Sequence, residues 1–192
     1  MQSDLKNALE RAALLGHQTT ALGANLYGHV PHVAPEAWLH IVYRGLTPAE
    51  RSKMEVSLGR SMPASLSEFF ASSNGISLFS SHLDIYGLRS DYTRTGDARW
   101  QPFDIIDTNV TERPRGTPKN WILIGSYFFD GSFVAIDANS EEVFRLAPGP
   151  SASLVNTWNN LNDFISAEVT RLSMLFNDHG HLTVGIENTV PN

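Results

Sequence analysis

Four closely spaced carboxylates are the residues of this sequence best suited to chemistry: Asp130, Asp137, Glu141 and Glu142. Two carboxyl groups held about 5 to 9 Å apart can act as general acid and general base, so a hydrolase built on Asp130, Asp137 and Glu142 is one interpretation. All four residues lie at predicted sheet turns, where side chains commonly form a solvated rim. Of the functional interpretations we prefer electrostatic recognition of a basic protein surface, because complementary charge raises association rate and specificity.

Five further residues have the composition of a metal site. His29 and His32 are spaced as H-x-x-H, and Asp178, His179 and His181 form a D-H-x-H group. Imidazole and carboxylate groups of this kind bind divalent metals. The two groups lie in a predicted linker and in a predicted tail, where a site would first have to overcome the conformational entropy of its loops. We therefore predict no metal site and no other cofactor.

The common catalytic signatures are missing from the sequence. It contains no GxGxxG, GxxxxGK[ST], HExxH or GxSxG segment. Ser126 follows a glycine and could be imagined as a nucleophile, but no base lies near it in the sequence, so we interpret it as an ordinary strand residue. We predict a binding protein without catalytic residues rather than an enzyme.

The aromatic side chains divide into a core set and a surface set. Those at periodic positions are predicted to be buried: Phe69, Phe70, Trp121, Phe133, Phe144 and Trp158. Four others are predicted to be more exposed: Tyr86, Tyr92, Trp100 and Tyr127. Tyrosine and tryptophan often anchor interfaces, because they offer a large area with few rotatable bonds. The predicted partner-binding residues are Asp84, Tyr86, Trp100, Asp130, Asp137, Glu141 and Glu142.

Composition limits the class of protein. The 192 residues suit one domain with or without an extension, and the lack of cysteine excludes disulfides and cysteine-ligated metal centres. The formal charge of −6 argues against binding nucleic acid through phosphate neutralisation and suits a basic partner. Charged residues near the start and the lack of a long apolar run predict a soluble, cytoplasmic protein without a signal peptide or membrane span.

Helix signals are unevenly distributed along the sequence. Residues 3–15 carry apolar side chains at helical spacing. Residues 16–35 hold three glycines and two prolines, which is typical of a linker, and Trp38, Ile41 and Val42 then suggest a second short helix.

The next helices have clearer boundaries. Thr47 and Glu50 have the spacing of a capping box at the start of a helix over 47–59. A further helix ends at Asn74-Gly75, whose residues readily adopt positive φ and form a joint to the sheet. Apolar side chains over 158–176 predict one long amphipathic helix.

After Gly75 the apolar period changes from about 3.6 to 2, and residues 76–79 and 83–88 are predicted strands. Residues 89–120 are predicted to be a long excursion with one or two helical turns. Three more strands follow, and Asp130-Gly131 between two of them is a strong hairpin signal. The pattern predicts an α+β fold whose antiparallel sheet of about five to six strands is covered by helices on one face.

This pattern also suggests three parts. Residues 1–45 are predicted to be an N-terminal helical extension, 46–176 the α+β domain, and 177–192 a tail that adds a strand through LTVGI or frays.

The order of these signals resembles the SUKH superfamily. LTPAERSKMEVSLGRSMPASLSEFFASSNG is similar to the entry motif of that superfamily, in which a helix ending near Leu-Gly is followed by Pro, a second helix and Asn-Gly. The likeness continues through LDIYGL, WILIGSYFFDGSFVAID and EEVFRL to the helix TWNNLNDFISAE. It covers about residues 46 to 170.

The resemblance implies a binding scaffold without catalytic residues. Members similar to this sequence are mostly bacterial immunity proteins that neutralise a cognate toxin, often a nuclease, and fungal cell-wall assembly regulators share the fold. The implied partner is thus a protein toxin, for example a basic nuclease domain, and neither a membrane nor nucleic acid itself. An intracellular scaffold or regulator is the alternative. The implied fold-defining residues are Pro63, Asn74, Gly75, Gly125, Gly131, Asp137 and Trp158.

Overall fold

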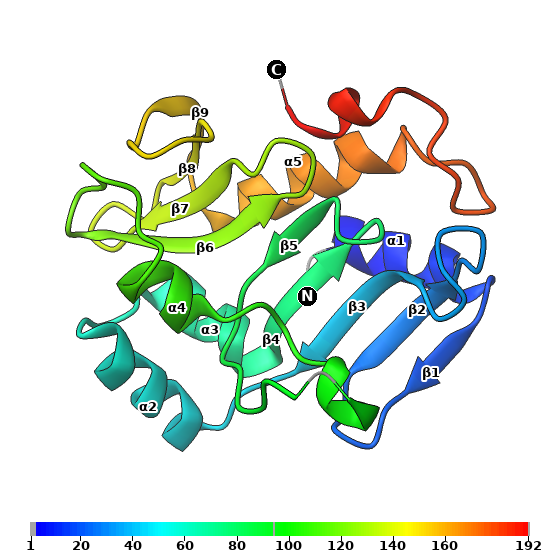
Figure 1. Cartoon of the computed structure of the whole chain (residues 1–192), viewed down its shortest axis with the longest axis horizontal. Helices are drawn as coiled ribbons and strands as arrows, with labels where there is room; N and C mark the ends of the chain where they lie inside the picture. Colours follow the sequence, from blue (N-terminus) through cyan, green and yellow to red (C-terminus); the bar gives the residue numbers. More distant parts are fainter. Residues whose placement is uncertain (1–2, 94, 192) are drawn as a thin grey trace.

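The computed structural model describes residues 3–93 and 95–191. Its central feature is a sheet of nine strands in which every neighbouring pair is antiparallel and the spatial order equals the chain order (Figure 1). The strands are β1 (His17–Thr19), β2 (Asn25–His29), β3 (Trp38–Arg44), β4 (Ser73–Leu78), β5 (Leu83–Ile85), β6 (Trp121–Tyr127), β7 (Phe133–Asp137), β8 (Val143–Leu146) and β9 (Leu154–Trp158). The α+β class is confirmed, but the predicted five to six strands are too few.

Helices accompany this sheet. They are α1 (Ser3–Ala13), α2 (Pro48–Leu58), α3 (Ala64–Ser72), α4 (Ile105–Val110) and α5 (Leu161–Ser173), with the 3-10 turns η1 (Gly96–Arg99) and η2 (Ile186–Thr189). α1 and α5 pack against each other over one face of the sheet, and α3 packs on β4 (Figure 1). The main core lies between these helices and the sheet and includes Leu9, Phe70 and Phe164.

The additional strands come mainly from residues 17–44, where the sequence pattern indicates a linker and a short helix. That interpretation is wrong, because Trp38, Ile41 and Val42 belong to β3, which pairs with both β2 and β4. A strand with neighbours on both sides and buried residues on both faces lacks clean alternation, so periodicity alone does not separate it from a helix. The first 45 residues thus contribute α1 and three strands of the common sheet.

The long C-terminal helix begins later than its apolar pattern suggests. Trp158 ends β9 opposite Val143, and α5 starts at Leu161 after Asn160, whose side chain accepts a hydrogen bond from the Asp163 amide at 2.9 Å. Trp158 packs edge-on against Phe164, with ring centroids 4.9 Å apart. Its ring therefore contributes to the same core from a strand.

The chain passes from α3 into β4 at the expected place, but the backbone conformation there differs from the predicted one. α3 ends at Ser72, before Asn74, and of the predicted pair only Gly75 has positive φ, at 90°. A Cβ on Gly75 would lie 2.5 Å from the Ile85 carbonyl oxygen, which no side chain tolerates. The Asn74 side chain accepts from the Leu88 amide at 2.7 Å and donates to the Leu88 carbonyl at 2.8 Å, so it extends the pairing of β4 beyond β5.

The Asp130-Gly131 hairpin joins β6 and β7 as an antiparallel pair, as predicted. Its connection is a five-residue loop, 128–132, rather than a tight two-residue turn, and only Gly131 of the pair has positive φ, at 69°. The Asp130 carboxylate accepts from the Ser132 amide at 2.9 Å, which stabilises the longer loop.

The excursion between β5 and β6 is attached to the edge of β6. On its β6 side, β5 pairs with the second half of β6 alone, and the first half of β6 faces α4. Here the Asn109 side chain accepts from the Leu123 amide at 2.9 Å and donates to the Leu123 carbonyl at 2.7 Å, taking the place of a neighbouring strand. Gly87 and Asp104 form a short bridge at the other end. The excursion is therefore held by a backbone bridge just before α4 and by the Asn109 side chain within α4.

Candidate partner-binding surface

The predicted carboxylates of the hairpins hold their own turns together. Asp137 accepts hydrogen bonds from the Asn139 amide at 2.7 Å, Asn120 Nδ2 at 2.7 Å and Trp121 Nε1 at 3.1 Å. Burial raises the pKa of this carboxyl, but the hydrogen bonds, first that from the Asn139 amide, outweigh burial and hold the pKa below its ordinary value. Asp137 is thus committed to the turn that follows β7.

The Asp130 carboxylate, near the other end of β7, also already has partners within the protein. Its carboxylate pairs with Arg145 Nη2 at 2.7 Å, and the side chains of Asp130 and Arg145 are only 21% and 9% exposed. Arg145 Nε also donates to Ser132 Oγ at 2.9 Å. Because Asp130 and Asp137 lie at opposite ends of a five-residue strand, the two carboxyls do not form the acid–base pair that a hydrolase would use.

The two neighbouring glutamates differ from each other. Glu141 accepts a hydrogen bond from the Ser65 amide at 3.2 Å, at the start of α3, and has a positive φ of 62°. Glu142 is exposed and accepts from Ser140 Oγ at 3.0 Å. Of the four rim carboxylates, Glu142 is thus the most open to a partner.

Asp84 lies in the sheet rather than on an open surface. It is 6% exposed and stands between Ser77 of β4 and Ser126 of β6 in the strand register. Burial raises its pKa to about 7, against the opposing effect of hydrogen bonds from the Ser77 and Ser81 hydroxyls. Its Oδ1 atom has no hydrogen-bond partner among the described residues.

The predicted aromatic anchors fall into three environments. Tyr86 and Tyr127 are buried, at 6% and 1% exposure, which contradicts their predicted exposure. Trp100 is half-buried and packs against a small cluster that includes Leu26 on the face opposite α1. Tyr92 is 56% exposed, as predicted.

The histidine groups are only partly brought together. His32 and His181 stack with ring centroids 3.6 Å apart, whereas His29 Nε2 is hydrogen-bonded to a backbone carbonyl and Asp178 pairs with Arg11. Within residues 3–93 and 95–191, no group of three or more histidine, aspartate or glutamate side chains is arranged to hold a metal ion.

The excursion forms a pocket of about 200 Å³ that we call the acidic cleft. Its lining includes Tyr86, Arg89, Tyr92, Phe103, Asp104, Asp107 and Glu112. The rings of Tyr92 and Phe103 are 56% and 53% exposed. Exposed rings beside carboxylates suit a cationic side chain, which the carboxylates attract and the ring faces accept.

The three carboxylates of the acidic cleft differ in whether they already have hydrogen-bond partners among the described residues. Asp104 accepts from the Ile106 amide at 3.1 Å and from the Tyr92 hydroxyl, so it caps α4. Asp107 and Glu112 have no hydrogen bond or ion pair to their carboxylates among residues 3–93 and 95–191.

One described cation lies in the lining of the acidic cleft. Arg89 donates to the Asp91 and Pro102 carbonyls at 3.0 and 3.1 Å, and its guanidinium lies over the Tyr92 ring at 5.6 Å. The described lining therefore has an excess of negative charge and two carboxylates ready for a partner, Asp107 and Glu112.

Sequence reasoning missed most of the acidic cleft. Asp104, Asp107 and Glu112 lie in the excursion, which has little periodicity. Two lining residues, Tyr86 and Tyr92, are predicted to be exposed, and only Tyr92 is. The segment from Asp104 to Glu112, with three acidic residues, is the available signal.

Among the described helices, none is both long and apolar enough to cross a membrane.

The fold and this surface define an α+β protein that presents side chains from an antiparallel sheet and a long excursion. The chain belongs to the SMI1 / KNR4 family (SUKH-1), whose sequence model matches residues 45–167. The match confirms the resemblance to the SUKH superfamily and includes the whole acidic cleft. A search of curated proteins found no match.

Proposed function

We propose that this protein is an immunity protein, which neutralises a cognate protein toxin by forming an inhibitory complex. Membership of the SUKH-1 family is consistent with this role. The observation that carries the proposal is the acidic cleft, where two carboxylates that have no partner among the described residues lie beside two exposed rings. A toxin that acts on nucleic acid needs lysine and arginine to hold phosphate, and these residues are the ones the acidic cleft would bind.

The acidic cleft would receive a lysine or arginine side chain of the toxin. Its carboxylates at Asp107 and Glu112 would pair with the cation, while the rings of Tyr92 and Phe103 would cover the aliphatic stem and the charged group. Val110, which is 64% exposed on α4, would add apolar contact beside the charge pair. A basic residue held in this way is no longer free to hold phosphate, so inhibition would occur by occlusion.

The acidic cleft is well suited to such binding because its frame is ordered without a partner. The Gly87 amide donates to the Phe103 carbonyl at 3.0 Å, and the Ile105 amide donates to the Gly87 carbonyl at 2.9 Å. A surface that is already in place avoids part of the entropy cost of association. A complete inhibitory interface should bury on the order of 1,600 Å², so residues beyond the acidic cleft must also take part.

The test is binding to, and protection against, the toxin domain encoded by the neighbouring gene. The double variant Asp107→Asn/Glu112→Gln should bind about 10- to 100-fold more weakly by titration calorimetry, because charged pairs at an interface are strongly coupled. The matched control is Glu10→Gln/Glu68→Gln, which changes the net charge equally on exposed positions of α1 and α3. Wild-type affinity should fall as salt rises.

Two results would contradict the proposal. Failure of the wild type to bind or protect against the toxin would remove the immunity role, and recovery of an endogenous regulatory protein instead would favour a scaffold. Equal weakening by both double variants would show that overall charge, and not the acidic cleft, controls binding.

A further inference from the structure

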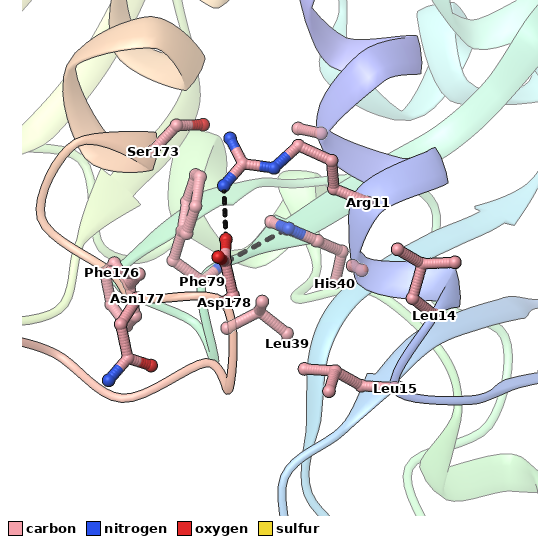
Figure 2. A pocket seen from close by; sticks show the side chains of 12 residues that line it. Arg11, Leu14, Leu15, Leu39, His40, Phe79, Ser173, Phe176, Asn177 and Asp178 are labelled. Atoms are coloured by element: carbon pink, nitrogen blue, oxygen red, sulfur yellow. Dashed lines mark hydrogen bonds and ion pairs between the residues drawn. The ribbon is translucent and has the colours of Figure 1, made fainter.

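A second pocket lies far from the acidic cleft in the chain, between α1, β3 and the segment after α5 (Figure 2). Its volume is about 310 Å³, and its lining is mainly apolar, with Ala12, Leu15, Leu39, Phe79 and Phe176 among the residues. Most of the lining falls outside residues 45–167, the part that matches the family. The pocket is therefore built largely by segments that this chain adds to the SUKH-1 region.

His40 supplies a buried polar group in this lining. Its side chain is 1% exposed, and its Nδ1 accepts a hydrogen bond from the Phe79 amide at 3.3 Å. The neutral ring therefore carries its proton on Nε2. Burial lowers the pKa of His40 to about 3, so the ring is neutral near pH 7. No hydrogen bond from the Nε2–H group joins it to another described residue, and His40 lines the pocket, so this group can donate to a molecule bound there.

An ion pair joins two residues that line the pocket. Arg11 Nη2 of α1 lies 2.8 Å from Asp178 Oδ1 in the segment after α5, and Figure 2 shows the two side chains meeting between these elements. The side chains are 63% and 87% exposed, so solvent screens the pair and its opening costs little.

We propose that this pocket binds a small neutral molecule with a mostly apolar body and one hydrogen-bond acceptor, such as a ketone or ester. The apolar lining would cover the body of the molecule, and its acceptor would bind the free His40 Nε2–H group. A neutral ligand is favoured over a carboxylate, because the buried ring is uncharged and would not compensate a buried anion. An apolar cavity of about 150 Å³ already suffices to bind benzene, so this volume admits a substituted ring.

The proposal is tested on the full chain with two probes of similar shape, acetophenone and toluene. Protein NMR with labelled methyl and imidazole groups should show shifts confined to Leu15, Leu39 and the His40 ring, with ligand NOEs to the same groups. Acetophenone should bind roughly fivefold more tightly than toluene, because only acetophenone accepts the hydrogen bond.

Two variants separate the pocket from unspecific binding. Ala8→Phe adds a ring to a residue that lines the pocket and should weaken both probes at least tenfold, whereas Ala71→Phe, at an exposed position of α3, should change neither. His40→Phe should retain toluene binding and abolish the preference for acetophenone. The unfolding temperature of each variant reports whether it folds.

The wild-type spectra decide the proposal even if a variant does not fold. Absence of shifts from both probes, or NOEs to residues elsewhere, would overturn it. Equal affinities for acetophenone and toluene would show that His40 does not recognise the ligand, and would overturn its acceptor requirement. None of these results depends on toxin binding, so this proposal and the proposed immunity role can fail independently.

Discussion

The carboxylates at the two ends of β7 and those of the acidic cleft differ in what they already bind. Asp130 and Asp137 each accept hydrogen bonds from their own turn and from a neighbouring segment, whereas Asp107 and Glu112 accept none from the described residues. Both sets look alike in sequence, because each consists of acidic residues a few positions apart. The contrast shows that acidic residues near hairpins often stabilise the hairpin, while unpaired carboxylates beside exposed rings are better candidates for recognition.

The largest expected effect on stability comes from replacing Arg145, the cation that pairs with Asp130. Arg145→Met should lower the free energy of unfolding by about 3 to 5 kcal/mol, because it leaves the Asp130 carboxylate largely buried and unpaired. Denaturant unfolding followed by circular dichroism measures this change. Lys53→Met removes a cation from an exposed position of α2 and serves as the control. A loss of less than 1 kcal/mol would mean that the Asp130–Arg145 pair is not structural.

A third carboxylate, Asp84, is buried in the sheet and should make the stability of the protein depend on pH. Its pKa of about 7 in the folded protein exceeds the ordinary 3.8, so the folded state binds the proton more tightly than the unfolded state. Its contribution to stability is fully present below about pH 4 and is lost as the pH rises through 7. From pH 4 to 8, wild-type stability should fall relative to Asp84→Asn by on the order of 3 kcal/mol. Parallel stability curves for the two proteins would refute this.

A smaller effect is expected at the other end of β7. Asp137→Ala removes the acceptor for the Asn139 amide, Asn120 Nδ2 and Trp121 Nε1. The free energy of unfolding should fall by about 1 to 3 kcal/mol, since these donors lose their protein acceptor. Thermal and denaturant unfolding measure the change, and an unchanged midpoint would contradict the structural role of this carboxylate.

The smallest effect on folding is expected in the acidic cleft. Asp107→Asn should change the free energy of unfolding by no more than about 0.5 kcal/mol, because the carboxylate has no partner to lose among the described residues. The same denaturant series used for Asp137→Ala measures it. A destabilisation as large as that of Asp137→Ala would remove the difference between the two sets of carboxylates.

Local signals of the sequence were reliable where a feature depends on neighbours in the chain. The capping box is present as predicted, with the Glu50 amide donating to Thr47 Oγ1 at 3.2 Å and the Thr47 amide donating to the Glu50 carboxylate at 2.8 Å. Gly59 ends α2 with a left-handed φ of 66°. These interactions join residues at most four positions apart, so their geometry is encoded in the residue types and their spacing.

The sequence by itself determined the α+β class, the antiparallel central hairpins, the caps of α2 and the likeness to SUKH proteins. Only the tertiary structure decided that residues 17–44 complete a nine-stranded sheet, that Asp84 is buried, and that Asp107 and Glu112 lie beside exposed rings without a partner in the described part of the chain. The physical reason is distance along the chain. Strand pairing and burial depend on residues that are far apart in sequence, and no local pattern specifies which of them will meet.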